Sequence, residues 1–125
     1  MSRTFIAVAA IFGGLSVAAG AFASHALREK LSDRAMEIFE TAARYQMYHA
    51  IALLLVALLL SREEFPQSTL VAAGWAFIIG IAIFSGSLYA LSLTDIKVLG
   101  AITPLGGAAF LAGWASLAIA AIGFK

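Results

Sequence analysis

The sequence contains no cysteine and has few charged residues. The absence of cysteine excludes disulfide bonds, iron–sulfur clusters and thiolate metal sites. Only 12% of the 125 residues are charged while 62% are hydrophobic, and the mean hydropathy is +0.98. A soluble domain of this length needs far more polar residues to cover its surface. The net charge of +1 supplies no basic field for nucleic acid. The composition therefore predicts an integral membrane protein, surrounded by the lipid bilayer and without a nucleic-acid partner.

Four uncharged runs are long enough to cross a bilayer, because a membrane-spanning helix needs roughly 20 apolar residues and at least about 17. The runs cover residues 4–24, 45–61, 65–94 and 98–124. We predict an all-α fold, a four-helix transmembrane bundle that forms a single domain over residues 1–125. Its spans are predicted at about residues 4–24, 42–61, 66–93 and 103–124.

The first run also has features of a secretory signal peptide. Arg3 precedes the apolar stretch, and Ala21-Phe22-Ala23 has the small-x-small form of a cleavage site. The run is longer than the apolar core of a signal peptide, which has about 7–15 residues. We therefore expect it to be retained as the first membrane-spanning helix.

One long polar segment joins the first two runs, from Ser24 to Arg44. Its apolar residues recur every three or four positions, which is typical of an amphipathic helix. Ser32 suits an N-cap, since its hydroxyl can accept from free amides of the next turn. Glu40 and Arg44 have the favourable order for a helical ion pair. We expect an amphipathic interfacial helix between the first two spans that continues into the second, as one helix from Ser32 to Ser61.

Two prolines suggest where the third and fourth helices begin. Pro66 suits the first turn of the third helix, where its missing N–H costs nothing. Inside a helix, Pro104 would leave the Gly100 carbonyl without a partner. We therefore expect Thr103 to be the N-cap and Pro104 the first residue of the fourth helix, after an interfacial stretch over residues 97–102.

Small residues recur at every fourth position in three of the runs. In lipid, close approach of backbones through small residues stabilises helix pairs more than burial of leucine does. We expect these stripes to face protein in a tight bundle. They are Ala10, Gly14 and Ala18; Ala82, Gly86 and Ala90; and Ala108, Ala112, Ser116 and Ala120, with Gly113 beside the last stripe.

Nearly all polar side chains of the spans fall in one leaflet, on the side of the 24–44 segment. Polar groups in a membrane are costly and are therefore candidates for function. The candidate polar site consists of His49, Tyr45, Gln46, Tyr48, His25, Ser85, Ser87, Tyr89 and Thr103. We predict that His49 points into the bundle and hydrogen-bonds either another helix or a polar ligand, because an unpaired imidazole facing acyl chains is costly.

No catalytic residue, metal site or cofactor is predicted. A serine–histidine–acid set is missing, because the acids lie only in the polar connections. Neither a Walker loop nor a dinucleotide-binding glycine pattern is present. His25 and His49 would suffice to ligate haem, but a catalytic metal requires a third ligand. Interfacial preferences of Tyr and His, and hydrogen bonds between helices, also account for the polar cluster.

Several stretches spread over the chain resemble a known family. They are Gly20-Ala21-Phe22, His25-Ala26-Leu27, Phe39-Glu40, Tyr45-Gln46-Met47-Tyr48-His49-Ala50, Phe84-Ser85-Gly86-Ser87-Leu88-Tyr89, Ile102-Thr103-Pro104-Leu105-Gly106-Gly107 and Gly113-Trp114. The chain is similar to domain-of-unknown-function family 423, small bacterial and mitochondrial membrane proteins that include YgdD-like proteins. Ala23-Ser24 departs from the family's usual Gly-Ala. The resemblance implies a four-helix inner-membrane protein and places the polar candidates within the family's motif, but it implies no activity.

Two functions of different classes remain open. The sequence favours a non-enzymatic role, as a structural or accessory protein or a subunit of a larger membrane complex, with a membrane-protein partner or as a homo-oligomer. The alternative is a binder or transporter of a small amphipathic ligand, quinone or lipid, in the leaflet that holds His25 and His49. The distribution of basic residues predicts that both termini lie outside the cytoplasm of a bacterial inner (plasma) membrane. One side carries Arg28, Lys30, Arg34, Arg44 and Lys97, and the other carries Arg3, Arg62 and Lys125.

Overall fold

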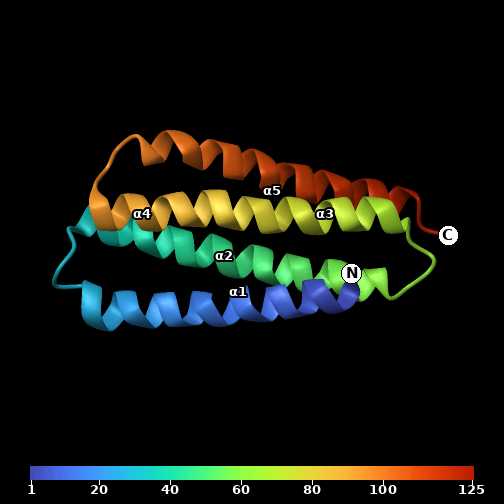
Figure 1. Cartoon of the computed structure of the whole chain (residues 1–125), viewed down its shortest axis with the longest axis horizontal. Helices are drawn as coiled ribbons and strands as arrows, with labels where there is room; N and C mark the ends of the chain where they lie inside the picture. Colours follow the sequence, from blue (N-terminus) through green and yellow to red (C-terminus); the bar gives the residue numbers. More distant parts are fainter.

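The chain folds into four long helical rods. The computed structural model describes all of residues 1–125 and contains only helices and turns. In chain order the elements are α1 (Ser2–Phe22), η1 (Ala23–Leu27), α2 (Asp33–Leu60), α3 (Gln67–Gly80), η2 (Ile81–Ser85), α4 (Gly86–Thr94) and α5 (Leu99–Ile122), where η1 and η2 are π-helical turns. Because η1 continues α1 and η2 joins α3 to α4, the rods are Ser2–Leu27, Asp33–Leu60, Gln67–Thr94 and Leu99–Ile122. The predicted all-α four-helix fold is confirmed, and both termini lie at the same end of the bundle (Figure 1).

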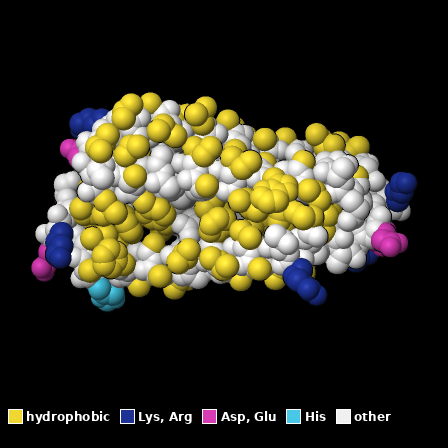
Figure 2. Space-filling view, in the orientation of Figure 1, with side chains coloured by type: hydrophobic (Ala, Val, Ile, Leu, Met, Phe, Trp, Pro, Cys, Tyr) yellow, Lys and Arg dark blue, Asp and Glu magenta, His cyan; other side chains and the backbone are white.

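All four rods are long and apolar enough to cross a membrane. They contain 24 to 28 residues. At 1.5 Å per residue this corresponds to about 36–42 Å, which exceeds the roughly 30 Å hydrocarbon core and approaches the thickness that includes the headgroups. Figure 2 shows hydrophobic side chains over the flank of the bundle and charged side chains gathered toward its two ends. The rods are therefore long enough to reach through the hydrocarbon core into the headgroup regions.

The two inner rods are α2 and the α3–η2–α4 rod. α1 packs along α2, and α5 packs along α3 and η2 (Figure 1). The main core lies between the rods, and its largest members have no exposed side-chain surface. They are Phe5, Leu53, Val56, Leu70 and Phe77. A smaller cluster of Ala23, Leu27, Met36 and Phe39 holds η1 against the start of α2.

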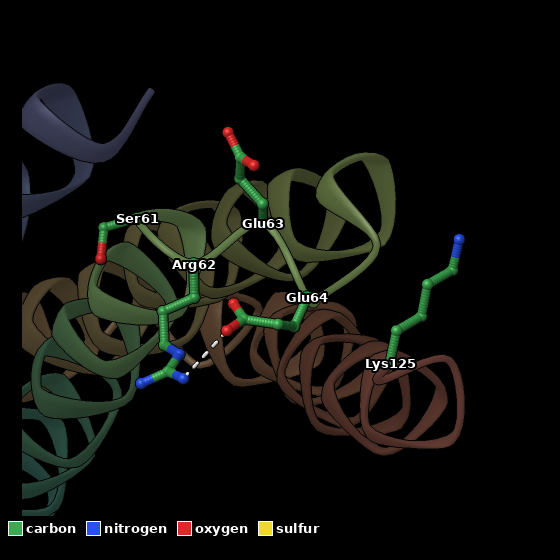
Figure 3. A pocket seen from close by; sticks show the side chains of 5 residues that line it. All are labelled: Ser61, Arg62, Glu63, Glu64 and Lys125. Carbon is green, nitrogen blue, oxygen red and sulfur yellow. Dashed lines mark hydrogen bonds and ion pairs between the residues drawn. The ribbon is translucent and has the colours of Figure 1, made fainter.

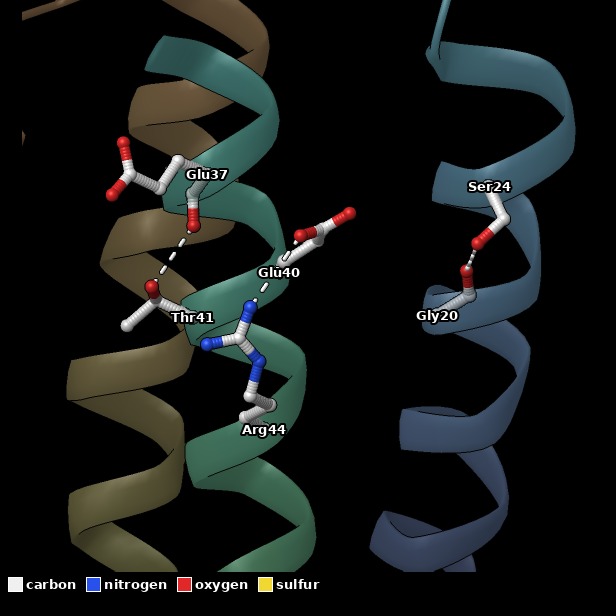
Figure 4. A network of polar contacts seen from close by, with 6 residues as sticks. All are labelled: Gly20, Ser24, Glu37, Glu40, Thr41 and Arg44. Atoms are coloured by element: carbon white, nitrogen blue, oxygen red, sulfur yellow. Dashed lines mark hydrogen bonds and ion pairs between the residues drawn. The ribbon is translucent and has the colours of Figure 1, made fainter. Parts of the chain in front are cut away.

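The helix expected from the polar segment is present as predicted. The Ser32 hydroxyl accepts from the Ala35 amide at 3.1 Å, and α2 then continues without interruption to Leu60. Arg44 reaches back to Glu40, with 3.4 Å between Nη2 and Oε2 (Figure 4). The N-cap and the ion pair read from the sequence are both confirmed.

The start of α5 differs from the prediction. The helix begins at Leu99, so Thr103 is not its N-cap and Pro104 lies inside it. The amides of Gly100 and Ala101 bond three residues back, to Lys97 and Val98, and this forms the first turn before the proline. Pro104 removes only the bond to the Gly100 carbonyl. That loss falls near the end of the rod, so the proline does not determine where the helix begins.

Most members of the small-residue stripes do not lie at helix contacts, which corrects the prediction for them, whereas Ala120 is buried in the main core. Seven of their members are exposed: Ala10, Gly14, Ala18, Ala82, Gly86, Ala108 and Ala112. Glycines at other positions receive aromatic rings of neighbouring helices instead. Gly74 receives Phe5, Gly80 receives Phe110, and Gly113 receives Phe77. A Cβ at any of these glycines would overlap the ring. A spacing of four residues shows that small residues share one face of a helix, but it does not show whether that face points toward another helix or outward.

Candidate functional site

His49 lies inside the bundle, where α2 faces α3 and α5. Its side chain is 5% exposed. Nδ1 is 2.8 Å from the Tyr45 carbonyl oxygen, and the Trp114 Nε1–H donates to Nε2 at 3.1 Å. Because an indole N–H only donates, Nε2 accepts and the proton is on Nδ1. The imidazole therefore uses both ring nitrogens within the protein, as the neutral Nδ1–H tautomer.

The His49 ring belongs to an aromatic stack between α2 and α5. It lies parallel to Phe110, with ring centroids 3.5 Å apart and 5° between the planes. Trp114 meets it edge-on at 5.9 Å. Tyr45 packs against Phe84 of η2, with centroids 4.8 Å apart. The prediction that His49 points inward and hydrogen-bonds another helix is confirmed, and the other helix is α5.

Gln46 connects three helices. Its Nε2 donates to the Phe12 carbonyl of α1 at 2.8 Å, and its Oε1 accepts from the Tyr89 hydroxyl of α4 at 2.7 Å. One turn earlier on α2, the carbonyls of Ala42 and Ala43 each accept a serine hydroxyl from a neighbouring rod. Ser85 of η2 donates to Ala42 at 2.8 Å, and Ser16 of α1 donates to Ala43 at 2.6 Å.

A further polar contact joins α4 to α5. The hydroxyl oxygens of Ser87 and Thr103 are 2.6 Å apart. Ser87 also reaches the Phe84 carbonyl at 3.0 Å. Every buried side-chain nitrogen and oxygen in the chain has a hydrogen-bond partner. The buried members of the candidate site are therefore interhelical ties.

The structure does not bring all nine candidates together. His25 is exposed on η1 at the end of the bundle. His49 lies 16 residues after the start of α2, about 24 Å along the helix. Tyr45 and Tyr48 are 39% and 53% exposed. No three His, Asp or Glu side chains gather closely enough to hold a metal ion.

Sequence reasoning missed Trp114 and Phe110, which contact His49, and it missed Ser16, which donates to the Ala43 carbonyl. Trp114 gave a signal, because an indole N–H inside an apolar run needs an acceptor. Ser16 gave a weaker one, as a hydroxyl inside the first run. Phe110 gave none, since a phenylalanine in a membrane helix has no polar group that requires a partner.

Two lateral grooves open on the flanks of the bundle. The α2–α5 groove has a volume of about 750 Å³, and its lining includes Tyr45, Tyr48, His49, Phe84, Phe110 and Trp114. The α1–α4 groove has a volume of about 540 Å³, and its lining includes Phe12, Ala18, Phe22, Ala82, Gly86 and Leu93. Figure 2 shows the surface hollowed between α1 and α4. Gln46 and Tyr89 also line the α1–α4 groove, where they are bonded to each other.

A polar corner formed by Ser61, Arg62, Glu63, Glu64 and Lys125 lies at the end of the bundle that holds the chain termini. Arg62 Nη2 lies 3.1 Å from Glu64 Oε1, whereas the Glu63 and Lys125 side chains point outward (Figure 3). The backbone amide of Glu64 and the Arg62 side chain hold the pKa of the Glu64 carboxyl below its usual value. This corner is exposed to solvent, and Arg62 and Glu64 form its only ion pair.

These features define a class: an integral membrane protein of four spanning helices, with short connections and an interior whose polar groups are paired. The family model described as "Protein of unknown function (DUF423)" matches residues 19–107. The chain is 44% identical over 122 residues to a UPF0382 membrane protein of Staphylococcus epidermidis, with 98% of each chain covered. It is 43% identical over 120 residues to the UPF0382 membrane protein YwdK of Bacillus subtilis, covering 96% of this chain and 97% of the relative. The chain belongs to the DUF423 family. No solved structure matches it.

Proposed function

We propose that this protein is a non-catalytic component of the bacterial inner membrane, acting as a structural or accessory subunit. The observation that carries the proposal is the pairing of every buried polar side-chain atom within the chain. Acid–base catalysis needs a group within hydrogen-bond reach of the substrate, whereas both nitrogens of His49 are already bonded to the protein. Exposed small residues on α1 and α5 also leave room for a partner helix to approach closely.

Native mass spectrometry of the full chain, extracted from its membrane in mild detergent, tests this proposal. We expect a homo-oligomer or a complex with another membrane protein. Ala112→Leu, on the exposed face of α5, should weaken the assembly without unfolding the chain. Leu111→Ala, also on an exposed position of α5, is the control for surface changes outside the stripe. A monomer without protein partners, carrying a bound small molecule, would contradict the proposal.

A second candidate is a binder or transporter of a small amphipathic ligand, such as a quinone or a lipid. The α2–α5 groove favours it, because two exposed tyrosines lie there beside the His49 ring. Exposed phenols within a span gain from a polar partner. Organic extraction and visible absorbance of the purified protein should then reveal a ligand, and Gly107→Leu should displace it, since that glycine faces open space in the groove. An empty wild-type protein would exclude this role.

The proposed orientation puts both termini outside the cytoplasm. Five basic residues lie on the side of the polar turn after η1 and three on the side of the termini. The side with more Lys and Arg is expected to face the cytoplasm. A carboxy-terminal reporter that is active only outside should be active, and one that is active only in the cytoplasm should be silent. The reverse pattern would overturn this orientation.

A further inference from the structure

The α1–α4 groove extends over one half of the membrane. Near the chain termini α1 lies against α3, where Phe5 fills the space at Gly74. Toward the other end α1 packs on α2 and leaves the α4 side open. On α1 the groove runs from Phe12 to Phe22. Ten residues of helix correspond to about 15 Å, half of the roughly 30 Å hydrocarbon thickness. The groove therefore has the length of one leaflet.

Free positive charge lies just beyond the outer end of this groove. After Phe22, η1 leads into a turn that carries Arg28 and Lys30. Neither forms an ion pair, whereas Arg34, Arg44, Arg62 and Lys97 each pair with a carboxylate. Glu29 lies between them and Asp33 follows at the start of α2, so these four charges sum to zero, but neither carboxylate pairs with Arg28 or Lys30. An apolar groove in the leaflet thus ends at unpaired cations at headgroup depth.

We propose that the α1–α4 groove binds an acyl chain of an anionic phospholipid whose phosphate is held by Arg28 and Lys30. The two cations without ion-pair partners select this occupant, because basic residues at the membrane surface attract anionic headgroups. The polar groups of the groove floor need no partner from the ligand, since Gln46 is bonded to Tyr89 and to the Phe12 carbonyl. The ligand surface that enters the groove is therefore apolar. This site is separate from both proposed functions and does not depend on either.

Gly86 offers a way to fill the groove without disturbing the bundle. It lines the groove, and a Cβ added there meets no atom within 4 Å. Gly86→Leu should therefore occupy the space of the acyl chain. Gly14→Leu is the matched control, because Gly14 also faces open space but lines neither the α1–α4 groove nor the α2–α5 groove.

The experiment is native mass spectrometry of the full chain with equal amounts of phosphatidylglycerol and phosphatidylcholine. The wild type and Gly14→Leu should retain phosphatidylglycerol in preference to phosphatidylcholine. Gly86→Leu should lose most of both lipids. Combined Arg28→Gln and Lys30→Gln should keep a bound lipid while its headgroup preference falls about fivefold for each cation removed. Arg3→Gln with Lys125→Gln, at the opposite end, should preserve the preference.

Four results would overturn the site. Equal retention of the two lipids by the wild type would mean that charge does not select the occupant. Unchanged binding by Gly86→Leu would place the lipid elsewhere. Complete displacement of phosphatidylglycerol by inorganic phosphate would mean that the groove contributes nothing. A dimer cross-linked through Gly86→Cys would make a second copy the occupant. Circular dichroism verifies folding, and if Gly86→Leu does not fold, Ala82→Leu on the same wall replaces it.

Discussion

The hydrogen bonds of His49 place opposite demands on its two nitrogens. Nδ1 faces the Tyr45 carbonyl and must donate, while Nε2 faces the Trp114 indole and must accept. Only the neutral ring with its proton on Nδ1 meets both demands. Protonation would leave two donors, Nε2–H and the indole N–H, facing each other. The His49 side chain therefore fixes the position of α5 relative to α2 through its hydrogen bond to Trp114 as well as through its ring packing on Phe110.

Replacement of His49 should weaken the bundle. We expect His49→Ala to lower the free energy of unfolding by about 1–2 kcal/mol, in the range of interhelical hydrogen bonds in membranes. Trp114→Phe keeps an aromatic ring but removes the donor, so it should cost less. The free-energy loss in the double variant should be smaller than the sum of the two single losses, by about 0.5 kcal/mol or more, because both changes remove the same hydrogen bond. Denaturant titration in detergent measures these free energies of unfolding. If the two single losses simply add in the double variant, His49 and Trp114 do not form the proposed hydrogen bond.

His49→Gln separates a structural role from a ligand role. An amide can replace part of the hydrogen bonding of the imidazole, so a ligand site predicts near-normal stability with loss of binding. A structural tie predicts that Gln restores part of the stability lost in His49→Ala, with no bound molecule affected. Unfolding and ligand extraction on the same preparations measure both outcomes.

The hydroxyl of Tyr89 provides a second test at the same scale. Tyr89→Phe leaves Gln46 Oε1 without its 2.7 Å donor. We expect a loss of about 0.6 kcal/mol, the average for hydrogen bonds between membrane helices, and at most about 1.7 kcal/mol. Tyr48→Phe is the matched control, because that tyrosine is exposed and its hydroxyl makes no hydrogen bond within the protein. Equal effects of the two variants would contradict the tie.

The sequence indicated the inward position of His49 but not its partners. A lone imidazole among apolar residues must be paired, and that argument requires no tertiary information. Trp114 lies 65 residues away on another helix, and its approach depends on how α5 is rotated. Membrane helices with nearly uniform hydrophobicity carry no amphipathic signal for that rotation. The structure places the exposed His25 on η1, apart from the buried His49 on α2, because a shared side of the membrane does not imply contact.

At the scale of helices, glycines that receive aromatic rings determine how closely the rods approach. Gly113→Ala places a Cβ against the Phe77 ring, which is itself fully buried. We expect it to destabilise the bundle by about 1–3 kcal/mol through overpacking. Gly107→Ala, on the same helix and facing open space, should be neutral or slightly stabilising, because alanine favours helix. Thermal unfolding in detergent compares the two, and similar melting temperatures would show that the Phe77 contact is tolerant.

Helices were predicted well because their determinants are local. Uncharged runs gave the number of rods, and the hydroxyl of Ser32 gave the start of α2. The start of α5 was wrong because Pro104 costs one hydrogen bond near a helix end, which the surrounding apolar helix tolerates. The prediction of which helix faces are in contact was wrong because the sequence does not distinguish Gly86 from Gly113. Only Gly113 receives an aromatic ring of a neighbouring helix.

At the scale of the whole molecule, the chain divides into two helical hairpins. α1 packs on α2, and α5 packs on α3 and η2. Three polar ties cross between the halves: Ser85 to Ala42, Tyr89 to Gln46 and Trp114 to His49. We expect separately expressed residues 1–61 and 62–125 to insert and to co-purify. Tyr89→Phe combined with Trp114→Phe in the second fragment should reduce recovery of the complex, and independent fragments would contradict this arrangement.

The ties along α1 also determine its translational register on α2. Ser2 donates to the Ala57 carbonyl, Gln46 to the Phe12 carbonyl, and Ser16 to the Ala43 carbonyl. The three bonds are distributed over the length of an antiparallel pair. A slide of α1 by one turn, about 5.4 Å, would break all of them at once and would also move the buried Phe5 ring away from Gly74. The contact between α1 and α2 therefore resists a piston-like sliding of one helix along the other.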